Sequence, residues 1–359
     1  MLTVSPSVRV SLGWTPWGTG SERPRDTIPR VEASALDRAQ RGDAEAFREL
    51  TQPHERELLL HCYRMLGSLA DAEDLLQDTL VAAWQGLPGF ERRASLRTWL
   101  YRIATNRCLN ALRDGRRRPR EPVPPFPPPA PTRRGEVTWL QPYPDALLDG
   151  LPASAPGPEA RLELKESVGL AFVAALQRMP PRQAATLILR DVLGYSGAET
   201  AELLGTTETA VKGALQRARA ATPSRPAGSP EDEVVSRFAD AFTRGDVEAV
   251  VALLTDDVWL SMPPAPHEYH GREAVREFLA RSFRHAAGRG LTLTRADANG
   301  QPAFVADLDG PAGIIVLTPR GDLLAAIARF HLPPKWARSL SAYGNRSAAG
   351  TKPGRDGSA

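Results

Sequence analysis

Residues 196–220, SGAETAELLGTTETAVKGALQRARA, combine two short helical patterns with one glycine between them. Ser196 followed three residues later by Glu199 is a capping-box signature, which starts the first helix at about Gly197. Gly205 can adopt the positive φ that a tight turn between helices needs. Two helices this short bury too little surface to stand alone, so they complete a core or present a face to a partner.

The second of these helices carries an outward face that is polar throughout. Thr206 or Thr207 can cap it, and its apolar residues recur at helical spacing, so they pack inward. The spacing from Ala201 through Gly205 to Val211 is that of a helix-turn-helix, whose second helix enters the major groove of DNA. A plain helical hairpin is the alternative. Thr, Lys, Gln and Arg suit base edges and phosphates. The outward residues are Thr207, Glu208, Thr209, Lys212, Gly213, Gln216, Arg217 and Arg219.

Two earlier helical patterns carry opposite charges. In residues 71–84, Leu76, Leu80 and Trp84 recur every four positions, and the other face is acidic. Residues 95–118 form a second pattern, and between positions 101 and 120 there are seven arginines and one acid. A charge run of this kind is often only a solvated face. An acidic helix and a basic helix in one small domain nevertheless predict two different partners, one of them polyanionic.

Length, charge and cysteine content narrow the kinds of protein that this chain can be. The chain of 359 residues has room for two or three domains, and its net charge of +3 with a pI of about 9.0 is weak evidence for nucleic acid. Cys62 and Cys108 have no CxxC partner, which favours a reduced, cytoplasmic setting and argues against a zinc site. No apolar run is long enough for a membrane span. We expect no metal and no cofactor.

Proline-rich stretches divide the chain into three ordered blocks. The longer stretch should be an extended linker, partly polyproline II, and its segment TWLQPYPD at 138–145 is apolar enough to favour docking. The expected organisation is a flexible extension at 1–30 (or a start codon assigned too early), a first block at 31–115, a Pro-rich linker at 116–158, a second block at 159–221, a short linker at 222–230, a third block at 231–338 and a disordered tail at 339–359.

The first two blocks resemble a bacterial sigma factor of the sigma-70 family, of the short extracytoplasmic-function (ECF) type. DAEDLLQDTLVAAW followed by GFERRASLRTWLYRIATNRCLNALRDGRRR resembles region 2, and residues 175–220 resemble region 4. Both motifs occur in the order of the family. Regions 1.1 and 3 of the housekeeping factors have no counterpart here, which favours the short type.

The resemblance implies roles for particular residues. It implies that the acidic face binds the clamp of the polymerase β′ subunit: Asp71, Glu73, Asp74, Gln77 and Asp78. It implies that region 2 melts the −10 element, with a loop at 90–95 that receives a flipped base and an adjoining helix that follows the strand: Phe90, Arg92, Arg93, Ser95, Arg97, Arg102, Asn106, Arg107 and Arg113.

For region 4, the resemblance implies −35 recognition by the helix-turn-helix and contact with the flap of the polymerase β subunit. The residues implied to meet the −35 element are Thr207, Glu208, Thr209, Lys212, Gln216, Arg217 and Arg219. The linker would then thread the polymerase cleft towards the RNA exit path.

The third block changes character. Two amphipathic helices, a strand at 258–262 and a helix after Gly271 precede four segments that read as antiparallel strands: LTLTRADA, QPAFVADL, GIIVLTP and LLAAIARFHL. The pattern predicts an α+β cone. FTRGDVEAVVALLTDDVWLSMPP and YHGREAVREFLA resemble the SnoaL-like branch of the NTF2-like superfamily. The fold class is therefore multidomain: two all-α sigma domains, a linker and an NTF2-like cone.

That superfamily includes enzymes, so candidate pocket residues matter. They are Trp259, Met262, His267, Tyr269, His270, Phe278 and His331. A general base would be a His or carboxylate among apolar walls. His267 and His270 fall in a proline-containing loop, where exposed histidines are common, so we expect no catalytic residue. A regulatory or ligand-sensing role, through a small ligand or intramolecular contacts, is favoured over plain scaffolding.

The sequence therefore predicts a cytoplasmic, non-enzymatic factor that works with core RNA polymerase and promoter DNA and has no membrane partner. The alternative is a one-component regulator, whose helix-turn-helix binds DNA while the cone senses a metabolite. That alternative leaves the acidic face at 71–78 and the basic helix after it unexplained.

Overall fold

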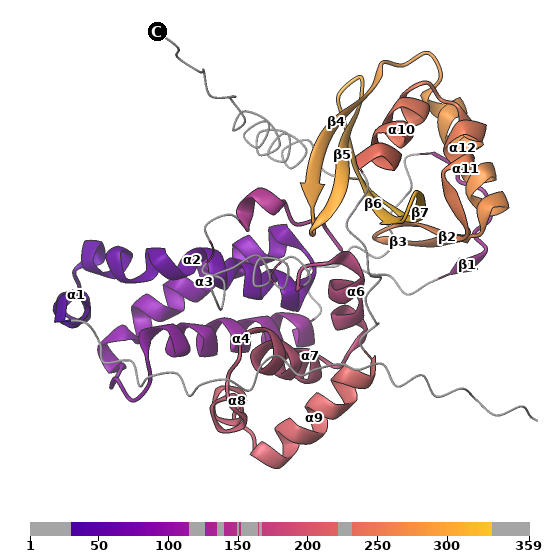
Figure 1. Ribbon diagram of the computed structural model, residues 1–359. Helices are drawn as coiled ribbons and strands as arrows, with labels where there is room; N and C mark the ends of the chain where they lie inside the picture. The colour runs from indigo at the N-terminus through magenta and orange to yellow at the C-terminus, as the bar shows by residue number, and fades with distance from the viewer. Residues whose placement is uncertain are drawn as a thin grey trace, which may run out of the picture.

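A computed structural model of the chain describes residues 30–114, 126–134, 140–148, 151, 164, 167–221 and 232–331. A helical half and a half built on one sheet lie side by side, as Figure 1 shows. The N-terminal extension before residue 30, the short linker at 222–230, the tail and parts of the Pro-rich linker lie outside the described residues, so the expectations for them stay predictions.

Four helices form the first block. The second helix begins after Asp43, whose side chain accepts hydrogen bonds from the amides of Glu45 and Ala46, and it ends at Gly67 with φ of 72°. Such caps satisfy backbone groups that a helix end leaves open. Leu96, Leu100 and Cys108 of the last helix are buried. The bounds are α1 (Arg30–Gln40), α2 (Ala44–Leu66), α3 (Leu69–Gly86) and α4 (Leu96–Asp114), with a 3₁₀ turn at Leu87–Gly89.

The second block ends in the predicted helix-turn-helix. The Ser196 hydroxyl accepts from the Glu199 amide at 3.2 Å, and the Glu199 carboxylate accepts from the Ser196 amide at 2.7 Å, which confirms the capping box. Gly205 has φ of 58°, and the Thr207 hydroxyl caps the last helix at 3.2 Å. The bounds are α6 (Leu170–Arg178), α7 (Pro181–Leu187) with a π-helical turn at Ile188–Val192, α8 (Gly197–Leu204) and α9 (Glu208–Ala221).

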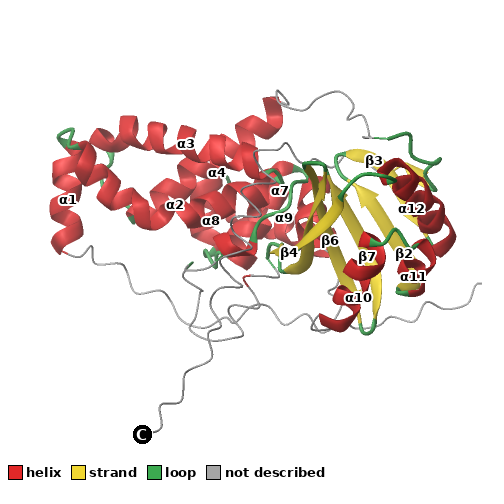
Figure 2. Ribbon diagram, turned by 90° about the horizontal axis from the view of Figure 1, so that it is seen from above, coloured by secondary structure: helices red, strands yellow, loops and turns green. Residues whose placement is uncertain are grey.

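The third block is a sheet with helices on one face, visible in Figure 2. Its strand order is β1-β3-β2-β7-β6-β5-β4. The last four strands, β4 to β7, pair antiparallel as expected, whereas β2 joins β7 in parallel, so the sheet is mixed. The bounds are α10 (Asp232–Thr243), α11 (Val247–Ala252), β2 (Leu254–Met262), β3 (Ala265–His270), α12 (Arg272–Ala286), β4 (Leu291–Ala298), β5 (Gln301–Leu308), β6 (Pro311–Arg320) and β7 (Leu323–Phe330).

Each face of this sheet is covered by a different part of the chain. Phe304 and Ile315 point into a cluster with the domain's own helices α10–α12. The opposite face belongs to the same apolar cluster as the helical half. Because alternate residues of a strand face opposite sides, an alternating strand can serve two cores. The residues on this outer face are Ala296, Ala298, Ala303, Val305, Ile314, Val316 and Phe330.

The described parts of the linker lie against the third block. Residues Arg133–Arg134 form β1, an added strand on the edge of β3. Phe126 is 7% exposed and packs on Phe278 at 5.5 Å between ring centroids. Tyr143, within the segment expected to dock, is fully buried. The described parts of the linker are therefore packed against the third block rather than serving only as a spacer.

Candidate nucleic-acid interface

The outward face of α9 is the first candidate surface. The predicted residues Thr207, Glu208, Thr209, Lys212, Gln216, Arg217 and Arg219 are all exposed, and Gly213 among them is half-buried. Val211, Leu215 and Ala218 on the other side are buried, so α9 shows one polar face and one packed face. That division gives a helix a face free to enter a groove.

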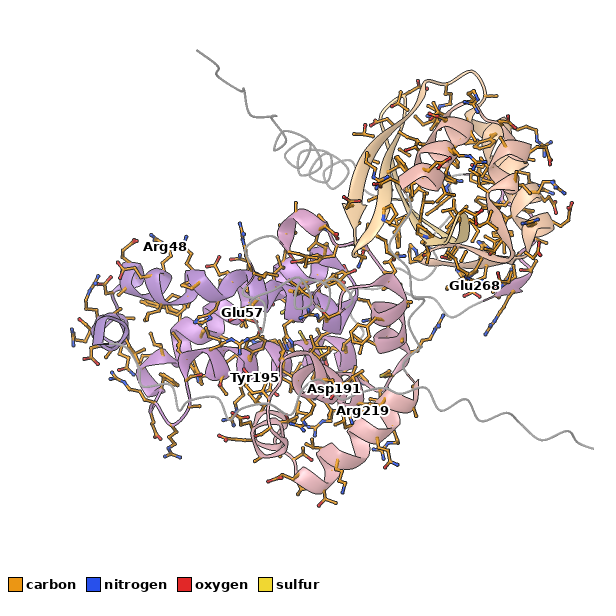
Figure 3. All side chains as sticks on the ribbon, viewed as in Figure 1. Arg48, Glu57, Asp191, Tyr195, Arg219 and Glu268 are labelled. Carbon is orange, nitrogen blue, oxygen red and sulfur yellow. The ribbon has the colours of Figure 1, made fainter. Side chains whose placement is uncertain are left out.

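Arg219 differs from the other members of this face. Its guanidinium forms two hydrogen bonds to the Asp191 carboxylate, at 2.7 and 2.8 Å, and the two side chains lie together in Figure 3. The hydrogen bond to Asp191 raises the pKa of Arg219. Asp191 is 8% exposed, so the pair ties α9 to the turn after α7. Arg219 has a structural task in addition to any contact with DNA.

The exposed face of α4 is the second candidate surface. Arg102, Asn106, Arg107 and Arg113 are exposed, as the helical spacing predicts. Within the described part of the chain, only Arg113 among them forms an ion pair, at 3.4 Å from its neighbour Asp114. A row of guanidinium groups on one helix face suits the phosphates of a nucleic acid strand.

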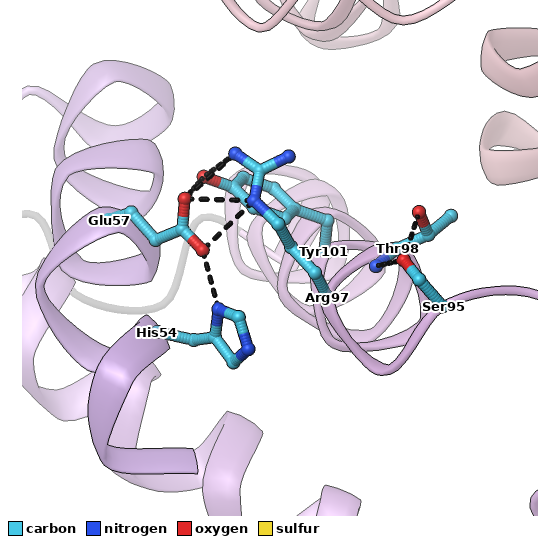
Figure 4. A network of polar contacts seen from close by, with 6 residues as sticks. All are labelled: His54, Glu57, Ser95, Arg97, Thr98 and Tyr101. Atoms are coloured by element: carbon cyan, nitrogen blue, oxygen red, sulfur yellow. Dashed lines mark hydrogen bonds and ion pairs between the residues drawn. The ribbon is translucent and has the colours of Figure 1, made fainter. Parts of the chain in front are cut away.

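Arg97 at the start of this helix is engaged inside the protein. It forms a two-pronged contact with the Glu57 carboxylate at 2.7 and 3.0 Å, and its guanidinium lies 4.8 Å from the ring centre of Tyr101. Figure 4 shows this network, in which His54 also contacts Glu57, at 2.7 Å. The structure places Arg97 in an intramolecular ion pair, and its contact with DNA stays a prediction.

The loop predicted to receive a base is only partly open. Phe90 is 7% exposed and lies 4.9 Å from the Trp99 ring, so the structure places it in the core rather than on the surface. Arg92 has φ of 59° and forms an ion pair with Asp37. Arg93 is exposed, and the Ser95 hydroxyl accepts from the Thr98 amide at 3.1 Å.

The acidic face of α3 lies away from the packed core. Glu73, Asp74, Gln77 and Asp78 are exposed and Asp71 is half-buried. Leu75 and Leu76 on the opposite side are buried. The predicted acidic face therefore forms one surface on one helix.

The candidate pocket residues of the third block do not form one pocket. Met262, Tyr269 and Phe278 share the cluster under the helices. Trp259 lies on the other face, stacked on His270 at 6.0 Å, while His331 is exposed beyond β7. His267 and His270 lie in β3, not in a loop as expected, because β3 pairs with both β1 and β2.

Neither a metal centre nor a membrane span is found in the described part of the chain. No three His, Cys, Asp or Glu side chains there are grouped to hold a metal ion. No described helix combines the length and apolar character needed to cross a bilayer.

Comparison with known families accounts for all three blocks. Residues 50–118 match the model of sigma-70 region 2, residues 169–221 match sigma-70 region 4, and residues 235–332 match the SnoaL-like domain. The ECF RNA polymerase sigma factor SigG of Mycobacterium tuberculosis is 41% identical over 309 residues, which cover 81% of each chain. The chain belongs to the ECF sigma factors of the sigma-70 family.

A second sigma factor supports the same architecture. SigJ of Mycobacterium tuberculosis is 32% identical over 278 residues, covering 73% of this chain and 82% of SigJ. Its crystal structure aligns with a TM-score of 0.53 at 24% identity, covering 78% of this chain and 95% of SigJ. The acidic face of α3 and the basic face of α4 thus belong to region 2 of a sigma factor. A one-component regulator would have no use for a region 2.

One residue joins the three domains of this sigma factor, and sequence reasoning did not find it. Asn299, in the β4–β5 hairpin turn, is 1% exposed and has φ of 58°. Its Nδ2 donates to the Tyr63 hydroxyl of region 2 at 2.8 Å and to the carbonyl of Val168, just before region 4, at 2.6 Å. Its Oδ1 accepts from the amide of Tyr143 in the linker at 2.8 Å. The Asn-Gly pair predicted a turn but not this burial.

A second set of bonds surrounds the same point. The Tyr63 hydroxyl donates to the Gln141 carbonyl at 2.9 Å, and the Gln141 amide donates to the carbonyl of Gly67 at 2.8 Å. Arg64 donates to the carbonyl of Ser167 at 3.1 Å. Burial lowers the pKa of Arg64 to about 10. We call Tyr63, Gln141, Tyr143, Val168 and Asn299 the interdomain junction.

Proposed function

We propose that this sigma factor recognises promoters through α4 and α9 and that its SnoaL-like domain holds it closed between rounds of initiation. The observation that carries the proposal is the interdomain junction, in which Asn299 bonds to region 2, to the linker and to Val168, the residue that directly precedes region 4.

The DNA contacts follow from the two exposed faces. The polar side chains of α9, led by Lys212, Gln216 and Arg217, reach base edges and phosphates of the −35 element. The arginines of α4, with Asn106, follow the single strand of the −10 element. Arg97 and Arg219 support these helices through Glu57 and Asp191.

The polymerase contact is assigned to α3. Its exposed acidic side chains meet the clamp of the β′ subunit, and region 4 meets the flap of the β subunit. Opposite charges on α3 and α4 let one small domain bind a protein on one helix and a polyanion on the next.

The closed state is inferred from how regions 2 and 4 pack. Helix α4 lies directly against α8, and Tyr101 of region 2 contacts Tyr195 of region 4 at 6.0 Å between ring centres. The −10 and −35 elements are separate stretches of one duplex, which lengthens by about 3.4 Å for each base pair between them. Two domains in direct contact cannot read both elements, so regions 2 and 4 separate before a promoter is bound.

The SnoaL-like domain opposes that separation. Its sheet buries an apolar face against the helical half, and the junction adds hydrogen bonds that opening must break. The linker is held as well, through β1 on β3 and through Phe126. A linker that follows the polymerase cleft has to leave these contacts, so polymerase and the SnoaL-like domain compete for it.

Run-off transcription with purified core polymerase tests the proposal on the full chain. Wild-type protein is compared with Asn299→Gly, which keeps a left-handed turn but removes the amide side chain. Asp309→Gly is the matched control, because Asp309 also has positive φ, at 55°, but lies in the exposed β5–β6 turn. We expect more transcript from Asn299→Gly and none without polymerase. Equal transcript from Asn299→Gly and wild type would contradict a closed state held by the junction.

A further inference from the structure

Arg329 of β7 occupies an unusual place for a charged side chain. It faces the helices of the SnoaL-like domain, beside its cross-strand neighbour Ile315, which is 1% exposed. The guanidinium carbon lies 5.4 Å from the ring centre of Phe278 and 5.7 Å from that of Phe242. Its Nη1 donates to the hydroxyl of Ser282 at 2.8 Å, and Ser282 is itself 6% exposed.

No carboxylate in the described part of the chain pairs with Arg329. Six exposed or half-exposed arginines of the same domain do form ion pairs: Arg272, Arg276, Arg281, Arg289, Arg295 and Arg320. Charged groups inside proteins are normally paired, because desolvation penalises a lone ion. The surroundings of Arg329 do penalise it: burial lowers the pKa of its guanidinium to about 10.

The guanidinium nevertheless keeps an open side. Nε and Nη2 have no hydrogen-bond acceptor among the described residues. The residue as a whole is only half-buried. A half-buried cation with unused donors and neighbouring aromatic rings has the features of a ligand anchor.

We propose that Arg329 and Ser282 form a binding site for a small carboxylate that carries an aromatic or otherwise flat apolar body. The planar fork of an arginine matches the two oxygens of a carboxylate. Phe242 and Phe278 flank the guanidinium and are 2% and 0% exposed, so a ligand body that displaces one of these rings must itself be apolar. The position under the helices of the domain excludes a DNA backbone, because a duplex cannot enter there.

The site lies one aromatic ring away from the linker. Phe278 contacts both the Arg329 guanidinium and Phe126, and Phe126 also stacks on His285 at 5.6 Å between ring centroids. A carboxylate that displaces Phe278 therefore changes the packing of the linker. The binding site stands independently of the closed state proposed above, because binding is measured without polymerase or DNA.

Isothermal titration calorimetry of the full chain with benzoate tests the site, with benzamide as the neutral analogue. Wild-type protein is compared with Arg329→Gln and Ser282→Ala. Arg284→Gln is the matched control, because Arg284 is an exposed arginine of α12 that forms no ion pair with the described residues. We expect benzoate to bind wild type and Arg284→Gln alike, and Arg329→Gln at least about tenfold more weakly.

The melting curve of Arg329→Gln shows whether that variant folds. If it does not fold, Ser282→Ala tests the site instead. Ser282→Ala should weaken benzoate binding severalfold, because the guanidinium loses the hydroxyl that orients it. Benzamide should bind none of the variants. Equal benzoate affinity in wild type and Arg329→Gln would overturn the proposal, and so would a wild-type chain that binds no benzoate at any soluble concentration.

Discussion

The Nδ2 of Asn299 donates a hydrogen bond of 2.8 Å to the hydroxyl of Tyr63, a residue 236 positions earlier in the chain. Both side chains are buried. This bond connects the turn of a SnoaL-like hairpin to the middle of region 2. An asparagine tolerates the left-handed backbone of the turn and still offers a donor and an acceptor, so one residue can serve as both turn and connector.

Replacing Tyr63 with phenylalanine should loosen the junction without a change of ring volume. The Asn299 amide and the Gln141 carbonyl would lose their partner, and buried unpaired groups cost about 1–3 kcal/mol each. We expect a lower melting temperature and a coupling of about 1 kcal/mol with Asn299→Gly in a double-mutant cycle. Strictly additive effects of the two changes would show that the bond contributes nothing.

Replacing Lys212 with alanine should weaken binding to a −35 duplex evenly across sequences. Lys212 is exposed on α9, so its loss should lower the slope of log affinity against log salt by about one. Fluorescence anisotropy at several salt concentrations measures the slope. Arg237→Ala removes one positive charge from an exposed site on α10 and should leave it unchanged. An unchanged slope for Lys212→Ala would place the DNA on another face.

Reversing charge on α3 should abolish association with polymerase. Asp74→Arg with Asp78→Arg puts two positive charges on an exposed acidic face, so like charges meet across the clamp contact. Co-purification with core enzyme measures the loss, and a normal melting temperature shows that the fold survives. Glu233→Arg with Asp240→Arg makes the same charge change on exposed positions of α10. Polymerase should still be retained by that control, and retention by the α3 variant would reject the assignment.

Local chemistry made much of the fold predictable. The capping box at Ser196 and Glu199, and the turn glycine Gly205, depend only on residues a few positions apart, so the sequence displays them directly. The four last strands were predicted within a few residues, because apolar alternation and the Asn-Gly and Asp-Gly turns are also local signals. The family resemblance supplied the order of the blocks.

Long-range pairings were not predictable in this way. In the sequence, Arg97 looks like one more basic residue of α4. No neighbouring residue in the sequence indicates that it forms an ion pair with Glu57, forty positions away. The parallel pairing of β2 with β7 spans most of a domain. Asn299 and Phe126 looked like ordinary turn and linker residues, since burial by a distant domain leaves no periodic pattern in a short segment.

Replacing Glu57 with glutamine should destabilise region 2. The carboxylate accepts from Arg97 Nε on Oε1 at 3.0 Å and from Arg97 Nη2 on Oε2 at 2.7 Å, and it accepts a bond of 3.3 Å from the Tyr101 hydroxyl. Removing one partner of a largely buried ion pair costs about 3 kcal/mol, because the remaining charge is left uncompensated. Urea unfolding followed by tryptophan fluorescence measures the change. Glu49→Gln, whose exposed carboxylate lies 3.6 Å from Arg38, should cost well under 1 kcal/mol. Equal losses in the two variants would mean that the Arg97 pair is no stronger than a surface contact.

The imidazole of His61 should make the stability of region 2 fall as the pH falls. It is buried between α2 and α4, with Nε2 at 2.9 Å from the Thr105 hydroxyl. Burial, together with the charges of Arg64 and Arg97, lowers its pKa to about 3 from the ordinary 6.5. Above pH 6.5 both the folded and the unfolded chain hold it neutral. Below pH 6.5 the His61 imidazole is protonated in the unfolded chain but stays neutral in the folded chain.

That difference sets the direction and window of the effect. The free energy of unfolding should drop by about 1.4 kcal/mol for each pH unit below 6.5, until the folded pKa is approached. Urea unfolding at pH 7.0 and 5.5 should therefore show a larger fall in the free energy of unfolding for wild type than for His61→Gln. The other titrating groups contribute equally to both proteins, so the difference reports on His61. His270→Gln removes a histidine from the C-terminal domain and should lose as much as wild type. A pH dependence that survives in His61→Gln would have to come from another group.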